Sequence, residues 1–321
     1  MSARIIYWTS DGAGLGEDGT ATVSKGLHAW IVAQGDADLI VYGGDVYDDG
    51  TAEQFEAFWD EMGRDVSLMC ETPGNHDWHT KRKDEVAGKI PSEYEASWSS
   101  HPSRQPIARE RRGGARYEHV IHSSEDPDSS WRLIFLDTGE CNKCDAESPW
   151  PLKHAEERVA WLEDVLVAGG RRSILFAHHS RLSMGGHGDN EGLKALWKQL
   201  FDDNHAPRIA LTVGGHDHNV SIYAPRDRHM QIVDGLAMGI ALWVNGAGGA
   251  SHSTSRIGTP PEFHNNEDYC VTKILIEDQA TLRVQLYSFG NGTPQAFDTP
   301  RLLINRVYSF VPEQMRILDE V

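Results

Sequence analysis

The chain has few basic residues, few cysteines and no long apolar run, and each shortage excludes a class of protein. Lysine and arginine total 30 against 48 aspartates and glutamates, and the net charge of -18 disfavours a broad nucleic-acid-binding surface. Four cysteines cannot supply a disulfide framework for 321 residues. Apolar stretches such as 241–244 are far shorter than the roughly 20 residues of a membrane-spanning helix. Because the N-terminus also lacks a signal-peptide pattern, we expect a cytoplasmic protein with no membrane partner.

Short apolar runs alternate with helical periods along most of the chain, which is typical of an α/β fold. Strands are expected near residues 4–8, 39–42, 66–70, 117–121, 131–136, 173–177, 209–213 and 242–244, with a hairpin of 269–276 and 281–287. Helices are expected where apolar residues repeat every three to four positions, near 23–31, 55–62, 159–166 and 193–200. We predict one domain over residues 1–321, with an extended excursion at about 78–116 and a C-terminal tail after about 296.

Three carboxylates lie within five positions directly after the expected strand at 39–42. Asp45, Asp48 and Asp49 would repel one another unless a cation neutralised them or solvent screened them. The segment is therefore either a solvated turn or part of a site.

Four further expected strands are also followed by potential metal ligands. In chain order the candidates are Asp11, Asp45, Asn75, His178 with His179, and His216 with His218. Side chains at the carboxyl ends of strands converge on one cleft in α/β sheets. Carboxylate, amide and imidazole groups without thiolate suit manganese, iron or zinc, and one carboxylate can bridge two such ions. We expect Asp45 to be that bridge.

Four motifs together resemble the calcineurin-like metallophosphoesterase family, in the order that the family shows. They are GDVYDDG at 44–50, GNHD at 74–77, HH at 178–179 and GHDH at 215–218. The outer strands look similar to the purple-acid-phosphatase branch. The resemblance implies a four-layer αββα sandwich of two mixed β-sheets flanked by helices.

The resemblance also implies roles for individual residues. A first metal would be held by Asp11, Asp45 and His218, and a second by Asp45, Asn75, His178 and His216. A hydroxide bridging the two ions would attack the phosphate ester. His76 would act as general acid toward the leaving oxygen or stabilise the phosphoryl charge, and Asp48 would orient His76. Candidate substrate contacts are Asn75, His76, His179 and His187. The family pattern favours His178 over His179 as the ligand.

The first motif departs from the family pattern, because Ala13 stands where most members have a histidine ligand. Three explanations remain open: Asp48 binds instead, Glu17 or Asp18 reaches in from the following loop, or the first site is weak and partly filled by water.

The sequence predicts a dinuclear-metal hydrolase that acts on small phosphorylated substrates, with phosphomonoesters favoured. A phosphodiesterase of the same fold is the alternative within the enzyme class, and a non-catalytic binding module with an incomplete first metal site is the alternative outside it. Nucleic acid is expected only as a small nucleotide substrate, and the sequence indicates no protein partner.

Overall fold

The computed structural model of the protein describes residues 3–12, 20–46, 51–62, 69–77, 117–122, 130–138, 155–169, 173–309 and 317–319. Ala13, Glu17, Asp18, Asp48 and the predicted excursion at about 78–116 lie outside these residues. Among the described residues, no helix combines the length and the apolar character needed to cross a membrane.

The described residues form two seven-stranded sheets, and the first has the strand order β14-β13-β12-β11-β1-β2-β3. Its strands are β1 (Arg4–Thr9), β2 (Leu39–Tyr42), β3 (Met69–Glu71), β11 (Cys270–Ile276), β12 (Thr281–Ser288), β13 (Arg301–Ser309) and β14 (Ile317–Asp319). The strands β1, β2 and β3 run parallel, and the remaining neighbours pair antiparallel. The observed order β1-α1-β2-α2-β3 follows the alternation of strands and helices expected from the sequence. Each helix returns the chain to the end of the sheet where the preceding strand began, so the next strand runs parallel to it.

The second sheet has the order β10-β8-β9-β7-β6-β5-β4. Its strands are β4 (Tyr117–His122), β5 (Ser130–Leu136), β6 (Ser173–Ala177), β7 (Leu211–Gly214), β8 (Val220–Arg226), β9 (Ile240–Asn245) and β10 (Phe263–Asn265). Its central strands β5, β6, β7 and β9 are parallel, whereas β4, β8 and β10 pair antiparallel. Both sheets are therefore mixed.

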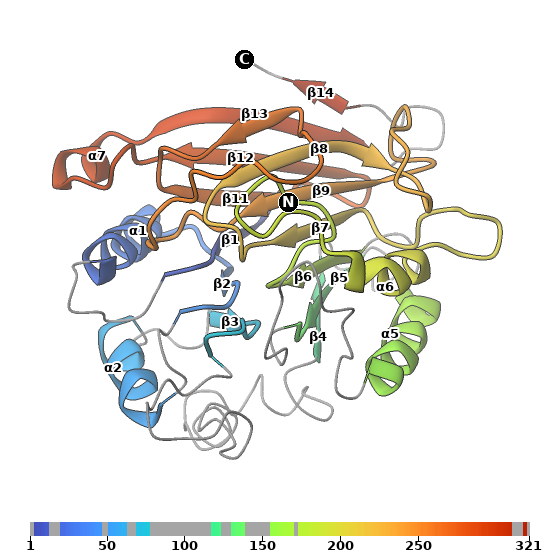
Figure 1. Cartoon of the computed structure of the whole chain (residues 1–321), viewed down its shortest axis with the longest axis horizontal. Helices are drawn as coiled ribbons and strands as arrows, with labels where there is room; N and C mark the ends of the chain where they lie inside the picture. Colours follow the sequence, from blue (N-terminus) through green and yellow to red (C-terminus); the bar gives the residue numbers. More distant parts are fainter. Residues whose placement is uncertain are drawn as a thin grey trace.

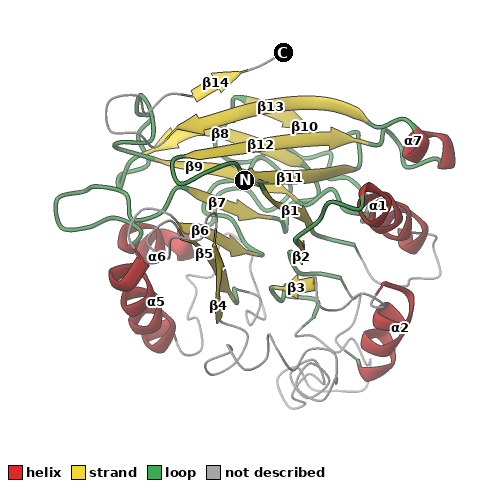
Figure 2. Ribbon diagram, turned by 180° about the vertical axis from the view of Figure 1, so that it is seen from behind, coloured by secondary structure: helices red, strands yellow, loops and turns green. Residues whose placement is uncertain are grey.

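The two sheets pack face to face and helices cover the outer faces. The helices are α1 (Thr20–Gln34), α2 (Ala52–Met62), α5 (Ala155–Gly169), η4 (Glu191–Leu193), α6 (Lys194–Gln199) and α7 (Pro294–Asp298). Figures 1 and 2 show α1 and α2 beside the first sheet and α5 and α6 beside the second. The predicted four-layer sandwich is confirmed, and it matches the layering that apolar faces on helices and sheets require.

Three apolar clusters hold the layers together. Between the sheets, the fully buried Trp8 ring stacks on Phe176 with centroids 5.6 Å apart. Outside the first sheet, Leu27 of α1 and Phe58 of α2 pack against its strands. Outside the second sheet, Leu162 and other apolar residues of α5 and α6 do the same. Each layer boundary thus removes apolar surface from water.

The expected tail contains structure that the sequence did not indicate. Strand β13 pairs antiparallel with β12 over most of its length, and β14 pairs with β13. Arg301–Ser309 and Ile317–Asp319 therefore extend the first sheet. The assignment of residues 1–321 to a single domain stays a prediction.

Candidate metal centre

The carboxyl ends of strands from both sheets meet at one place. Asp11 follows β1, Asp45 follows β2, and His216 follows β7. The Asp11 amide donates to the Gly44 carbonyl at 2.9 Å, and the His216 amide donates to Asp11 Oδ2 at 2.9 Å. The first bond joins the loops that follow β1 and β2 of the first sheet, and the second bond joins that sheet to the loop after β7 of the second.

The backbone is strained at three of these positions. Asp11, Asp45 and His216 have φ angles of 60°, 50° and 71°, a region that non-glycine residues seldom adopt and that costs on the order of 1–3 kcal/mol each. The adjacent loops come so close that a Cβ at Gly74 would lie 2.1 Å from Asp45 Oδ1. Glycine in the GNHD motif therefore makes room for the Asp45 carboxylate.

One group of potential ligands consists of Asp11, Asp45 and His178, whose ligand atoms lie within 4.8 Å of one another and are buried. His178 Nε2 is 3.2 Å from Asp45 Oδ2 and 4.0 Å from Asp11 Oδ1. His218 approaches from the solvent side, with Nε2 3.8 Å from Asp11 Oδ1. Asp11 thus faces the imidazole nitrogens of His178 and His218, and Asp45 faces that of His178.

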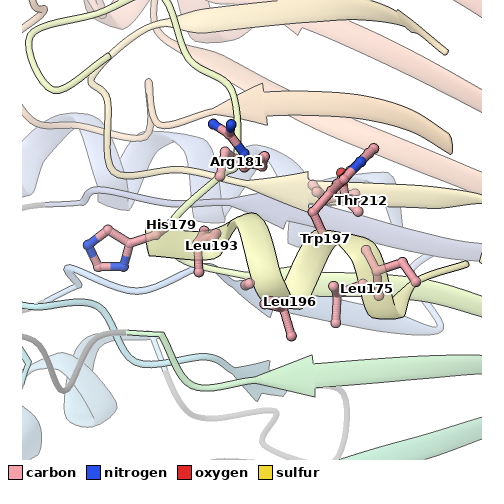
Figure 3. Close-up of a pocket in the computed structure, with 11 residues that line it drawn as sticks. Leu175, His179, Arg181, Leu193, Leu196, Trp197 and Thr212 are labelled. Atoms are coloured by element: carbon pink, nitrogen blue, oxygen red, sulfur yellow. The ribbon is translucent and has the colours of Figure 1, made fainter. Parts of the chain in front are cut away.

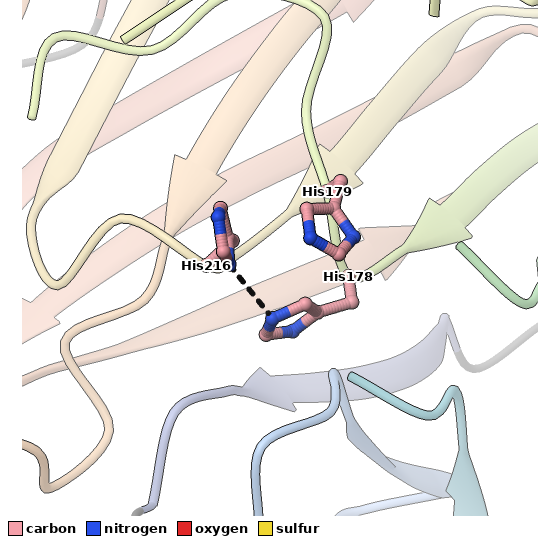
Figure 4. Close-up of side chains that lie close together, drawn as sticks. All are labelled: His178, His179 and His216. Atoms are coloured by element: carbon pink, nitrogen blue, oxygen red, sulfur yellow. Dashed lines mark hydrogen bonds between the residues drawn. The ribbon is translucent and has the colours of Figure 1, made fainter. Parts of the chain in front are cut away.

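A second group consists of His178, His179 and His216, with ligand atoms again within 4.8 Å of one another. His216 Nδ1 lies 3.3 Å from His178 Nε2, and Figure 4 shows the two rings turned toward each other with His179 alongside. Two imidazole nitrogens at this separation can bind one ion together.

Backbone carbonyls fix the orientation of two histidines. His178 Nδ1 bonds to the Gly43 carbonyl at 2.8 Å, and His218 Nδ1 bonds to the Ser251 carbonyl at 2.7 Å. Because a carbonyl only accepts, each Nδ1 is the donor, and each Nε2 is left to face the carboxylates. Metal-binding histidines are commonly held in this way.

Two oxygens at the centre lack a hydrogen-bond partner among the described residues. Within the described part of the chain, Asp11 Oδ1 and Asn75 Oδ1 are buried and accept no hydrogen bond. A buried polar atom without a partner costs about 1–3 kcal/mol, so such atoms call for a ligand. Oxygen and imidazole donors fit a divalent cation of the manganese, iron or zinc kind.

The charges at the centre perturb one another. Burial acts to lower the pKa of His178, but the carboxylates of Asp45 and Asp11 outweigh it and raise that pKa to about 10. Burial acts to raise the pKa of Asp45, yet His178 and the amide of His76 hold it well below its usual range. A positive charge is therefore favoured between the carboxylates, whether it is a proton or a metal ion.

His76 and Asp77 lie directly against Asp45. The His76 amide donates to Asp45 Oδ1 at 2.8 Å, which places the predicted general acid beside the predicted bridging carboxylate. Asp77 Oδ2 accepts the Asp45 amide at 2.9 Å and the Gly74 amide at 2.6 Å. Motif reasoning assigned no role to Asp77, although its place in the GNHD motif was a signal that it shapes this turn.

Ser10 is a second residue that motif reasoning missed. Its Oγ donates to Asp11 Oδ2 at 2.7 Å, so it helps to orient the carboxylate. Its position next to Asp11 was the available signal.

His179 and His187 flank His216. The rings of His179 and His187 lie 4.1 and 4.0 Å from the His216 ring, measured between centroids. His179 is buried, its Nδ1 is 3.2 Å from Thr138 Oγ1, and burial with the neighbouring imidazoles holds its pKa well below the usual range. His187 is exposed. Of these two predicted substrate contacts, His187 is the one that solvent reaches.

His179 also borders a small cavity beneath α6, with a volume of about 30 Å³. Figure 3 shows Leu193, Leu196 and Trp197 from the helical segment around it. Its lining is mainly apolar, and none of Asp11, Asp45, Asn75 and His216 belongs to it. The cavity therefore adjoins the candidate metal-binding groups at His179 and is otherwise lined by residues outside them.

A two-sheet sandwich with carboxylate, amide and imidazole groups at its strand ends defines a metal-binding α/β protein. The chain belongs to the calcineurin-like phosphoesterase family, whose sequence profile matches residues 21–220. The resemblance predicted from the motifs is thereby confirmed. Asp11 precedes the matched segment, while Asp45, Asn75, His178, His216 and His218 lie inside it. A search of curated proteins found no significant match.

Several solved structures share the fold. Purple acid phosphatase PPD1 from yellow lupin (Lupinus luteus) seeds superposes with a TM-score of 0.67 at 15% identity, over 96% of this chain and 54% of that one. The chain thus spans about half the length of the lupin protein. GAP50, the anchor in the inner membrane complex of Plasmodium, gives 0.64 at 14% identity, over 98% and 91% of the two chains. A dimetal phosphatase from Danio rerio gives 0.54 at 12% identity, over 97% and 100%.

Proposed function

We propose that the protein is a dinuclear-metal hydrolase of phosphate esters that prefers small phosphomonoesters such as phosphorylated metabolites or nucleotides. The observation that carries this proposal is the convergence of buried carboxylate and imidazole groups that follow four strands, beside the GNHD turn that contains Asn75. Asp11 Oδ1 and Asn75 Oδ1 also lack hydrogen-bond partners among the described residues. Members of this family use a dinuclear metal centre.

The donor set fits two ions. Asp11, Asp45 and His218 would hold the first, and Asp45, Asn75, His178 and His216 the second, with manganese, iron or zinc as candidates. When bound, the ions would supply a nucleophile at neutral pH and positive charge for the phosphoryl oxygens.

The chain's own residues would bind the substrate and move a proton. His76 is half-buried, and its backbone amide donates to Asp45, so its side chain lies near the centre and would protonate the leaving oxygen. Asp48, which lies outside the described residues, is the predicted partner that orients it. His187 would donate a hydrogen bond to the phosphate from the exposed side of the cluster, with Asn75 and His179 as further contacts.

Two considerations favour a small monoester over a diester. The lupin and Danio rerio structures with this fold are phosphatases by name. The net charge of -18 opposes the approach of a polyanion such as nucleic acid. A phosphodiesterase acting through the same residues remains the second candidate within the enzyme class.

A non-catalytic binding module is the candidate from another class. Ala13 removes one ligand of the first site, and GAP50, which shares the fold, is named an anchor. Metal content separates the two classes. Two manganese ions per chain would support the hydrolase, and one ion or none after incubation with manganese would support the binding module.

The decisive experiment compares hydrolysis of p-nitrophenyl phosphate and bis-p-nitrophenyl phosphate in manganese, with Asn75→Ala as the control. Faster turnover of the monoester that disappears in Asn75→Ala, together with loss of one metal ion, is the expected result. Preference for the diester would show that the protein is a phosphodiesterase and not a phosphatase. If neither ester is hydrolysed by protein that holds two ions, the proposal is wrong.

A further inference from the structure

His187 depends on a neighbouring segment for its position. It lies in the loop between β6 and η4, and its ring centroid is 4.0 Å from that of His216, a predicted metal ligand, with the two ring planes tilted by 34°. The His187 side chain is exposed while the His216 side chain is buried. An exposed imidazole on a loop needs supporting contacts to the backbone of that loop if it is to bind a phosphate group in one defined geometry.

Asp217 supplies such a hold. Its Oδ1 accepts the backbone amide of His187 at 2.9 Å, and its side chain is almost completely buried. Asp217 lies between His216 and His218 in the sequence. The segment His216–His218 therefore carries two predicted metal ligands, and its Asp217 side chain also binds the loop of His187, the predicted substrate contact.

Two other contacts fit this loop closely against the same segment. A Cβ on Gly185 would lie 2.4 Å from Asp217 Cγ, so only glycine lets the loop approach the carboxylate. Asn219 Nδ2 donates to the Met184 carbonyl at 3.3 Å. The loop is thus held at Met184 and at His187 by side chains two residues apart.

The buried Asp217 carboxylate is expected to lower the stability of the fold. Its second oxygen, Oδ2, is buried and has no hydrogen-bond partner within the described residues. Burial of a carboxylate with so few hydrogen bonds is unfavourable. A role in placing His187 would account for a buried carboxylate at this position.

We propose that Asp217 is a positioning residue that holds His187 over the metal centre so that its imidazole meets the phosphoryl group of the substrate. The inference rests on the proposed phosphatase function and adds the residue that positions His187 for substrate binding. Asp217 acts through His187 and contacts neither the substrate nor the reacting atoms.

The test is a double-mutant cycle of Asp217→Ala and His187→Ala in the manganese-loaded protein. We measure KM and kcat for p-nitrophenyl phosphate, the Kd for inorganic phosphate by calorimetry, and metal content. Each single variant should raise KM and Kd about tenfold, the loss expected for one charge-assisted hydrogen bond. In the His187→Ala background, adding Asp217→Ala should change either constant by less than about twofold.

Two further variants separate positioning from folding. Asp217→Asn keeps an oxygen that can accept the His187 amide, so KM should stay within about twofold of the wild type. Gly185→Ala pushes the loop away from an intact Asp217 and should reproduce the tenfold rise. Asp202→Ala is the matched control, because Asp202 accepts the backbone amides of Asn204 and Ala206 in a loop outside the metal centre. It should change neither constant.

Equal losses from Asp217→Ala in both backgrounds, or loss of a metal ion from that variant, would overturn the inference while leaving the phosphatase intact. A wild-type protein that holds two ions but neither hydrolyses the ester nor binds phosphate would instead refute the proposed function, and the role of Asp217 with it.

Discussion

Replacing Gly44 by alanine should disable the metal centre through backbone geometry alone. Gly44 precedes Asp45 and has φ +90°, and its added Cβ would lie 2.5 Å from the Gly74 nitrogen and 2.7 Å from His178 Nδ1. The nearest of these atoms belongs to the backbone and cannot rotate away. The GDVYDDG and GNHD segments must therefore move apart, and both carry predicted metal ligands.

The magnitude follows by comparison with Gly35, which follows α1. Gly35 also has a positive φ, +65°, but a Cβ there would meet nothing within 4 Å. Gly35→Ala should cost about 1 kcal/mol, because strain of about 1–2 kcal/mol is partly offset by the stiffer unfolded chain. Gly44→Ala adds an overpacking cost of about 1–3 kcal/mol, for a total of about 2–4 kcal/mol.

Urea unfolding of both variants after treatment with EDTA measures these costs without the metal contribution. Metal content after reloading with manganese then reports the centre itself. We expect Gly44→Ala to lose more stability than Gly35→Ala and to hold fewer than two ions, whereas Gly35→Ala holds both. Equal stability losses and equal metal contents in the two variants would refute the reasoning.

Two other predictions concern the histidines of the centre. His76→Ala should keep both metal ions and lower kcat, because His76 is the proposed general acid and is not a predicted ligand; an unchanged kcat would remove that role. In protein stripped of metal, His178 holds its proton up to a pKa of about 10 against 6.5 in the unfolded chain. This stabilisation is complete below pH 6.5 and is lost as the pH rises to about 10, so urea midpoints should fall across that window and His178→Gln should flatten the fall; a flat wild-type profile would contradict the assignment.

Much of the fold could be predicted because its signals are local. Apolar residues such as Leu27 and Ile31 recur on one face of α1, and the run Leu39–Tyr42 is wholly buried as β2. The spacing of apolar residues reflects which side of a helix or strand meets the core, and a segment of a few neighbouring residues is enough to show it. The candidate site was predicted in part for the same reason, since GNHD and GHDH are short contiguous segments.

Other features depend on partners that are distant in the chain. Strand β13 forms because β12 offers it an edge, and the sequence of Arg301–Ser309 alone did not reveal that edge. His178 and His179 are adjacent and chemically identical, but the Gly43 carbonyl turns only His178 Nε2 toward Asp45.

The sequence by itself thus determined the layered α/β architecture, the family and the set of candidate ligands. Tertiary structure decided how the ligands face one another, which oxygens lack partners, and that Asp217 holds His187 across 30 residues of chain. The physical reason is that periodicity and motif chemistry are properties of neighbouring residues, whereas hydrogen-bond partners and burial depend on which loops the packed sheets bring together.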